Sequence, residues 1–222
     1  MQRFFDIFLS GVTLIVLSPL LIPLIFILRL TGEGAVFFKG SRVGKAKKTF
    51  QILKFATMLK NSPNMGTGTL TIGNDPRILP VGRVLRRLKI NELPQLINVF
   101  LGDMSLVGPR PQSKRNFDAF HEEVRDAITL VRPGLTGLGS LIFRDEESIL
   151  SGVKDPDDFY DSVVMPYKGA IEQWYVEHES FALYLKIIFV TFYGLVLSRP
   201  IHLFEIFPDI PRPNDKNLDF LN

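Results

Sequence analysis

The sequence contains no cysteine and only three histidines, and these shortages exclude several kinds of chemistry. Without cysteine the chain cannot form disulfides, bind zinc through sulfur or use a thiol as nucleophile. His121, His178 and His202 are far apart in the sequence, which argues against a histidine metal site or a Ser-His-Asp triad. The Gly-, Asn- and Thr-rich stretch at residues 61–74 is predicted as a loop, and it lacks the Walker spacing because no Gly-Lys-Ser/Thr follows it.

Apolar residues, by contrast, are abundant and unevenly spread. They make up 46% of the 222 residues, and 19 of them are phenylalanine. The formal net charge of +3 favours anionic partners such as phospholipids and nucleotides. No recognition-helix pattern and no alternation of basic and aromatic residues accompanies this charge, so nucleic acid is not an expected partner. The length suits one domain together with a membrane anchor.

The first apolar run, from Ile7 to Leu28, is long enough to cross a bilayer. Pro19 and Pro23 interrupt its middle, and proline removes a backbone donor and kinks a helix. The hydroxyl of Ser18 is a candidate partner for a carbonyl group that the kink sets free. Two topologies follow: a kinked transmembrane helix, or a re-entrant helix that returns to the membrane face it entered.

In the re-entrant topology Asp6 and Arg29 lie at the same membrane interface, and Arg3 and Asp6 act as interface anchors rather than as catalysts. Seven lysines and arginines between Lys39 and Lys60 follow the run, as expected of a cytoplasmic flank that attracts anionic lipid headgroups.

The remaining chain predicts a mostly helical α/β core with a small β-hairpin and interfacial helices. We divide the whole chain into a re-entrant membrane helix (1–31), a membrane-resting core (32–200) and an irregular tail (201–222). The predicted hairpin has strands at residues 36–38 and 49–53, and helices are predicted at residues 79–88, 93–101, 116–130 and 167–184. A turn-rich loop is expected at 132–137, and a mainly polar surface segment at 148–161. The second apolar run, 181–198, suits an interfacial helix with Lys186 extending to the interface.

The most informative stretch is Ile90–Pro111, which brings two acids and a restrained arginine close together in sequence. Glu92 falls in the first turn of the predicted helix, where the helix dipole favours a carboxylate that binds metal. Two prolines flank Arg110, and a stiff loop aims a planar guanidinium well at a phosphate. With Asp103, this pattern predicts a site for a metal-bound diphosphate. The alternative is a helix cap, a surface acid and a structural ion pair.

These motifs together resemble the bacterial sugar transferases, also called monotopic phosphoglycosyl transferases, almost from end to end. The resemblance rests on one motif in the broken apolar run and on six motifs that follow it in order. They are Ser18-Pro19 in that run, then Arg42-x-Gly44, Lys54-Phe55 with Thr57-Met58, Asn74-Asp75-Pro76-Arg77, Arg86 with Glu92-Leu93-Pro94-Gln95, Gly102 to Pro111, and Arg132-Pro133-Gly134-x-Thr136-Gly137.

The resemblance implies transfer of a sugar-1-phosphate from a nucleoside diphosphate sugar, usually UDP-linked, to polyprenol phosphate on the cytoplasmic face of the bacterial inner membrane. It implies Mg²⁺, with Glu92, Asn91 and Asp103 as candidate ligands. Arg110 suits the diphosphate, and Lys54, Arg86 and Arg132 suit further phosphate groups. Asp75 and Arg77 form either a structural turn pair or part of the site. The exposed apolar faces would favour a homo-oligomer.

Two positions depart from the family pattern. The family uses an Asp before the Glu as a covalent nucleophile, and this chain has Asn91 there; Ala56 stands where the family often has Arg. A neutral amide is not a carboxylate nucleophile. Three explanations of Asn91 follow. It is a natural variant, in which the chemistry is carried by Glu92, by Asp103 or by direct attack of the lipid phosphate. Otherwise it is an engineered change, or it marks an inactive protein that serves as a membrane scaffold.

Overall fold

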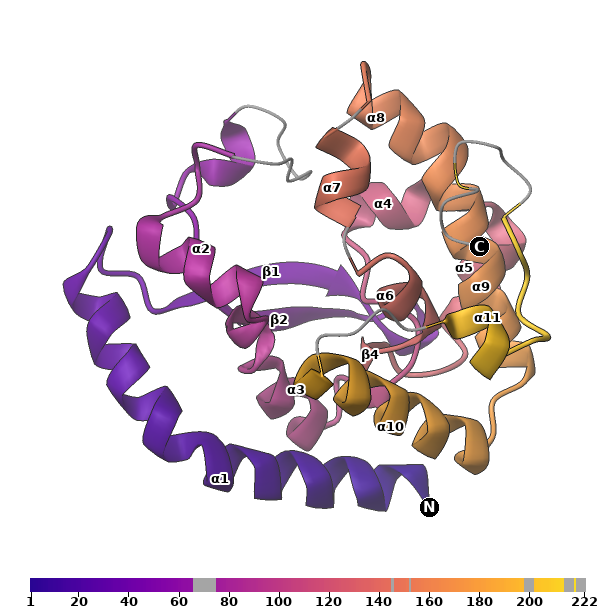
Figure 1. Ribbon diagram of the computed structural model, residues 1–222, viewed down its shortest axis with the longest axis horizontal. Coiled ribbons are helices and arrows are strands. Elements are labelled where there is room, and N and C mark those ends of the chain that lie inside the picture. Colours follow the sequence, from indigo (N-terminus) through magenta and orange to yellow (C-terminus); the bar gives the residue numbers. More distant parts are fainter. Residues whose placement is uncertain (66–74, 145, 152, 198–201, 214–217, 219–222) are drawn as a thin grey trace.

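The chain begins with one long helix, α1 (Gln2–Leu30), which curves along the edge of the molecule below α3 and α10 (Figure 1). The structure is a computed structural model that describes residues 1–65, 75–144, 146–151, 153–197, 202–213 and 218. The predicted loop at 61–74 therefore lies mostly outside the described residues. Within them, α1 is the one helix long and apolar enough to cross a membrane.

The bend in α1 lies in the middle of the helix, as its prolines predict (Figure 1). Pro19 has no N–H to donate to the carbonyl oxygen of Ile15, one turn earlier. The Ser18 hydroxyl donates to that oxygen at 2.8 Å instead. The predicted compensation at Ser18-Pro19 is confirmed, and the bend turns the concave side of α1 toward the core.

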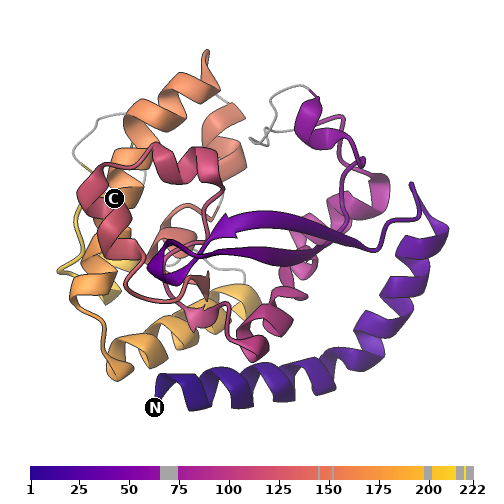
Figure 2. The ribbon, with the colours of Figure 1, turned by 180° about the vertical axis from the view of Figure 1, so that it is seen from behind.

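The predicted hairpin is present and longer than expected. It consists of β1 (Phe37–Val43) and β2 (Thr49–Phe55), which pair antiparallel with Phe37 opposite Phe55. Figure 2 shows this hairpin crossing the molecule above α1. A second sheet joins β3 (Ser105–Val107) and β4 (Gly134–Thr136) in parallel. The prediction of a loop at 132–137 is therefore wrong, because hydrogen bonds to a strand distant in sequence override the local turn signal.

The helices are mostly short. They are α2 (Pro80–Arg87), α3 (Gln95–Leu101), α4 (Lys114–Asp118), α5 (Glu122–Ile128), α6 (Leu138–Ile142), α7 (Glu146–Ser151), α8 (Pro156–Phe159), α9 (Met165–Glu177), α10 (Phe181–Leu197) and α11 (Leu203–Ile206), with a π-helical turn at Tyr160–Val164 before α9.

Three predictions for the second half of the chain need correction. The helix expected at 116–130 is two helices, because Phe117 and Phe120 both enter the core and the backbone is extended at His121. The helix expected at 167–184 ends at Glu177, and α10 starts separately. Residues 148–161 are not wholly a surface segment, since Leu150 and Tyr160 are buried.

The tail is also more ordered than predicted. It contains α11, and Phe204, Phe207 and Ile210 pack into the main core formed by α5, α6, α9 and α10. Lys186 of α10, predicted to extend to the membrane interface, is exposed and also contacts the tail. Its ammonium group donates to the carbonyl oxygen of Ile206 at 2.6 Å and lies over the ring of Phe207. These contacts fasten the tail to α10.

Polar side chains of the first turns of α1 bind the core. Asp6 is 2% exposed, and its Oδ1 accepts hydrogen bonds from the Ser105 hydroxyl at 3.0 Å, the Leu106 N–H at 2.8 Å and the Tyr184 hydroxyl at 2.9 Å. Arg3 donates to carbonyl oxygens at the end of α3. The prediction that Asp6 is an interface anchor is therefore wrong, because its side chain is buried among protein groups.

We expect Asp6→Ala to lower the free energy of unfolding by about 3 kcal/mol, since it leaves buried donors on β3 and α10 without an acceptor. Thermal or urea unfolding in detergent micelles measures this change. Asp126→Ala is the control, because Asp126 pairs only at the surface with Lys47 and such pairs contribute little. Equal effects of the two substitutions would contradict the proposed importance of Asp6.

Candidate active site

Three charged side chains from separate elements meet beside the hairpin. Lys54 lies on β2, Glu92 in a 3₁₀ turn (Ile90–Glu92), and Arg110 in the loop after β3. The Lys54 ammonium donates to Glu92 Oε1 at 2.5 Å, and Arg110 Nη2 lies 3.7 Å from the same oxygen. The structure thus brings together three of the residues that the sequence assigned to a phosphate site.

The charge state of Glu92 follows from these neighbours. Burial alone would raise the pKa of Glu92, but the charges of Lys54 and Arg110 outweigh it and lower the pKa to about 2. Glu92 is therefore ionised at neutral pH. Burial lowers the pKa of Lys54, and Glu92 opposes that effect. The site holds a carboxylate between two cations that it does not fully neutralise.

A fourth charged side chain, Arg42 on β1, is near enough to Arg110 and Glu92 to interact with their charges. Burial and the charge of Arg110 lower its pKa, and the charge of Glu92 raises it. The sequence analysis did not assign Arg42 to the site, although the Arg42-x-Gly44 motif was a signal that could have done so. With Lys54 and Arg110, Arg42 makes the site rich in positive charge around a single acid, as binding of a diphosphate requires.

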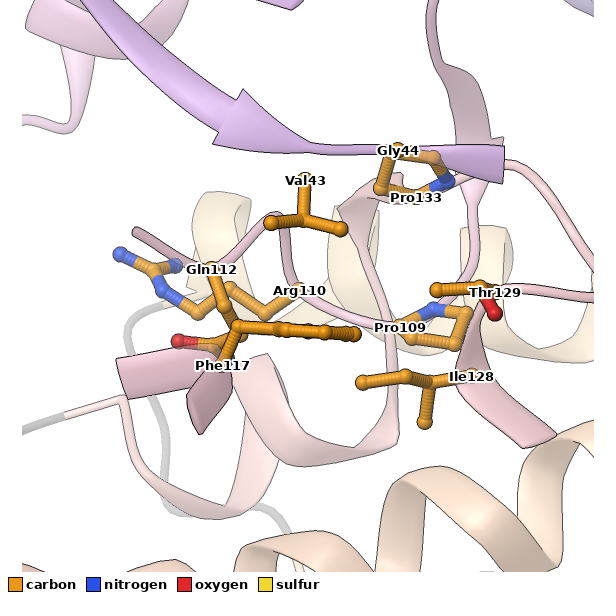
Figure 3. A pocket seen from close by; sticks show the side chains of 9 residues that line it. All are labelled: Val43, Gly44, Pro109, Arg110, Gln112, Phe117, Ile128, Thr129 and Pro133. Atoms are coloured by element: carbon orange, nitrogen blue, oxygen red, sulfur yellow. The ribbon is translucent and has the colours of Figure 1, made fainter. Parts of the chain in front are cut away.

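The loop that carries Arg110 is fixed from both sides. The Gly108 N–H donates to the carbonyl oxygen of Thr136 at 3.0 Å, and the Gly134 N–H donates to that of Pro109 at 2.8 Å. A Cβ atom at Gly108 would collide with the carbonyl oxygen of Arg132, so only glycine allows this approach. Figure 3 shows the Arg110 guanidinium extending away from the apolar side chains of Val43 and Pro109. The stiff arginine loop inferred from the prolines is held mainly by the parallel strands.

Asn91 precedes Glu92 in the same turn and is buried. Its Oδ1 has no hydrogen-bond partner among the residues that the structure describes. A buried oxygen without a donor is an available ligand. Magnesium at nucleotide sites often takes one or two protein oxygens and completes its shell with phosphates and water. Glu92 and Asn91 fit that limited role.

The other predicted site residues lie elsewhere. Asp103 follows the far end of α3, where it accepts a hydrogen bond from Asn98, so α3 separates it from Glu92 by roughly 10 Å of helix. Arg132 lies at that same end and donates to the carbonyl oxygen of Gly102 at 2.8 Å. The described residues contain no cluster of three or more acidic or histidine side chains suited to a metal.

Hydrogen bonds from Arg77 lower the pKa of Asp75, and the charge of Arg86, on α2, adds to that effect. Asp75 and Arg77 form a buried ion pair with 2.6 Å between Oδ2 and Nη2. Arg77 also donates to the carbonyl oxygens of Ser62 and Met65. The structural turn pair, one of the two alternatives from the sequence, is therefore present.

A second cluster of ionisable side chains, which was not predicted from the sequence, interacts with Arg110. It consists of Glu146, Tyr160, Lys168 and Glu172, and the charge of Arg110 interacts with all four. The Arg110 backbone N–H donates to Glu172 Oε1 at 3.1 Å. One feature of the sequence could have indicated this cluster. Lys168 and Glu172 lie one turn apart, among apolar neighbours, in the helix predicted there.

Burial raises the pKa of Glu172 to about 7, although the Arg110 N–H and the charge of Lys168 act in the opposite direction. Between the ordinary pKa of 4.5 and about 7, the folded protein binds a proton that the unfolded chain releases. The free energy of unfolding must therefore fall as pH rises through this window, and this contribution levels off above it.

We expect Glu172→Gln to remove that fall, which amounts to about 3 kcal/mol for a pKa raised this far. Urea unfolding of both proteins in micelles at pH 5 and pH 8 measures the difference. Glu177→Gln, at the exposed end of the same helix, should keep the pH dependence of the wild type. The same pH dependence in wild type and Glu172→Gln would rule out a titrating Glu172.

Comparison with known proteins agrees with this geometry. The family model for bacterial sugar transferases matches residues 1–198. The exopolysaccharide production protein ExoY of Sinorhizobium fredii is 31% identical over 212 residues, which cover 89% of this chain and 86% of that protein. The exopolysaccharide production protein PSS of Rhizobium leguminosarum bv. phaseoli is 36% identical, with 86% and 92% covered.

A longer relative is the undecaprenyl-phosphate galactose phosphotransferase of Salmonella typhimurium, which is 35% identical over 206 residues. Those residues cover 86% of this chain and 39% of that protein. Because the family match extends from the bent helix through the charged site to α10, the chain belongs to the bacterial sugar transferases.

Proposed function

We propose that this enzyme transfers a sugar-1-phosphate from a UDP-sugar to polyprenol phosphate, releasing UMP and leaving a polyprenyl-diphosphate-sugar. The observation that carries the proposal is the group of three cations, Arg42, Lys54 and Arg110, around the ionised Glu92. Two relatives support it, an undecaprenyl-phosphate glucose phosphotransferase from Komagataeibacter xylinus and the Salmonella galactose enzyme. Exopolysaccharide production in the rhizobial relatives suggests a role in surface glycan synthesis.

Phosphoryl transfer needs positioned groups and neutralised charge more than it needs covalent chemistry from the protein. The planar guanidinium of Arg110 would donate two hydrogen bonds to phosphate oxygens. The Lys54 ammonium and the Arg42 guanidinium would add positive charge beside it. Glu92 holds Lys54 in place and, with the free Oδ1 of Asn91, would hold Mg²⁺. When bound, that ion would neutralise negative charge on the diphosphate.

The assay that tests this function measures UMP release from UDP-sugars by the purified chain. Release should require both polyprenol phosphate and Mg²⁺. Arg110→Lys keeps the charge but loses the fork, and we expect it to lower kcat/KM by about 10- to 100-fold, on the order of 1–3 kcal/mol. Arg125→Ala, on α5, is the control and should change kcat/KM little. An unchanged rate for Arg110→Lys would make Arg110 a structural residue.

Asn91 decides which chemical route the enzyme uses. If the route needs a carboxylate nucleophile at this position, wild type is inactive and Asn91→Asp restores turnover with a covalent phosphosugar adduct visible by mass spectrometry. We instead expect wild-type turnover that Glu92→Gln abolishes, because the cations and Glu92 are all in place. Asn91→Asp should then give no gain, since another negative charge would face the substrate phosphates.

A large gain in Asn91→Asp without wild-type activity would contradict that expectation. Inactivity of both proteins would favour a second function, a catalytically silent membrane scaffold, which the neutral side chain at position 91 alone suggests.

We further propose that α1 is re-entrant and that the core rests on an anionic bilayer at the cytoplasmic face of the bacterial inner membrane. The bend in α1 supports this, as do the large apolar side chains that α1, α3 and α10 leave exposed, among them Phe8, Val16, Phe26, Leu101, Phe189 and Phe192. Such faces also make a homo-oligomer a candidate assembly.

Because the chain has no cysteine, a single Gln2→Cys substitution reports the position of the N-terminus. We expect this cysteine to resist a membrane-impermeant thiol reagent in intact cells and to react after lysis. Adding Ser18→Ala and Pro19→Leu should straighten α1 and expose the N-terminus to the reagent. Labelling of Gln2→Cys alone in intact cells would instead establish a spanning helix.

A further inference from the structure

The charge cluster behind Arg110 is built around a lysine that is removed from water. Lys168 is 1% exposed, and its ammonium lies 2.8 Å from Glu146 Oε1 and 3.5 Å from the Tyr160 hydroxyl. The rings of Phe143 and Tyr160 lie 5.0 and 5.3 Å from the same nitrogen. A buried ammonium costs several kcal/mol unless it is paired, so these contacts keep Glu146 in one position.

Glu146 is the member of the cluster that reaches solvent, with 24% of its side chain exposed. Burial would raise the pKa of Glu146, but Lys168, Arg110 and a hydrogen bond with Tyr160 lower it, so the carboxylate is ionised at neutral pH. Glu146 begins α7, which lies beside α8 in Figure 1. Solvent therefore has partial access to a fixed, charged acceptor at this place.

A chain of contacts joins this carboxylate to the phosphate site. Lys168 holds Glu146, and Glu172, one turn further along α9, accepts from the backbone N–H of Arg110. The charge of Arg110 acts on both Glu146 and Glu92. Arg110 thus interacts with two carboxylates that have different surroundings. Glu92 is close to Lys54 and Arg110, whereas Glu146 is paired with the buried Lys168.

A phosphate group would be repelled by Glu146, whereas hydroxyl and amide N–H groups would donate to it. In a nucleoside diphosphate sugar, the group attached directly to the terminal phosphate is the sugar. We propose that Glu146, positioned by Lys168 and Tyr160, is a specificity-determining residue that accepts hydrogen bonds from the sugar of the donor. This inference rests on the proposed function.

The competing role for the ion pair is to hold α7 against α9, without any contact to a ligand. In that case a change at Glu146 would alter stability and affect all nucleotides equally. A contact with the sugar would affect nucleotides that carry a sugar and spare those that do not. Binding measured without the acceptor lipid separates the two roles, and it does so whether or not the chain turns over.

The experiment measures Kd by calorimetry for UDP, UDP-glucose, UDP-galactose and their N-acetylated counterparts, with the full chain in micelles and Mg²⁺ present. The measured quantity is the Kd of the tightest-binding UDP-sugar divided by the Kd of UDP. Glu146→Gln should raise this ratio by at least tenfold, because a neutral amide replaces a charged acceptor. Its Kd for UDP should stay within about twofold of wild type. Tyr160→Phe, which removes one hydroxyl, should raise the ratio in the same direction by less.

Glu122→Gln, an exposed acid on α5, is the matched control and should leave the ratio unchanged. An unchanged ratio in Glu146→Gln, or an equal loss of UDP and UDP-sugar affinity, overturns the inference. The proposed function fails separately, if wild type releases no UMP from any UDP-sugar. A melting temperature for each variant identifies loss of fold, and if Glu146→Gln does not fold, the ratio in Tyr160→Phe decides.

Discussion

The buried carboxylate of Asp6 joins the membrane helix to the strand that leads to the active site. Its Oδ1 accepts from Ser105 and Leu106 on β3 and from Tyr184 on α10. Strand β3 continues directly into the Gly108 to Arg110 loop, so the long apolar helix α1 is hydrogen-bonded to the strand that leads to Arg110. A carboxylate suits this role because it accepts several hydrogen bonds at once. The position of α1 relative to the site is thereby set by protein contacts.

The second constraint is electrostatic. Arg42, Lys54 and Arg110 come from different elements and would repel one another in a partly buried site. Glu92 relieves that repulsion by binding Lys54 and lying near Arg110, while Glu172 holds the Arg110 backbone. The remaining positive charge is available to a diphosphate. The site is thus assembled in advance for an anionic ligand, and the acid serves to hold the cations in place.

The sequence predicts well those features that depend on neighbours in the chain. The proline bend with its Ser18 hydrogen bond, the hairpin, and the Asp75–Arg77 pair are local and are confirmed. Features created by distant contacts were missed. The β3–β4 pairing, the burial of Asp6 and the Lys168 cluster depend on residues that are tens of positions apart, and periodicity carries no information on such pairs.

The same distinction explains the predicted ligand set around Glu92. Asp103 is close to Glu92 in sequence, but a helix between them carries it to the opposite end of α3, where Asn98 binds it. Asn91 stays beside Glu92 and keeps an oxygen without a donor. A carboxylate at 91 would add a negative charge next to Glu92, so the neutral amide leaves this turn with one negative charge fewer. Under the proposed function, the smaller negative charge would strengthen the binding of phosphate groups. The neutral amide also leaves Glu92 as the one carboxylate in this turn that could take part in catalysis.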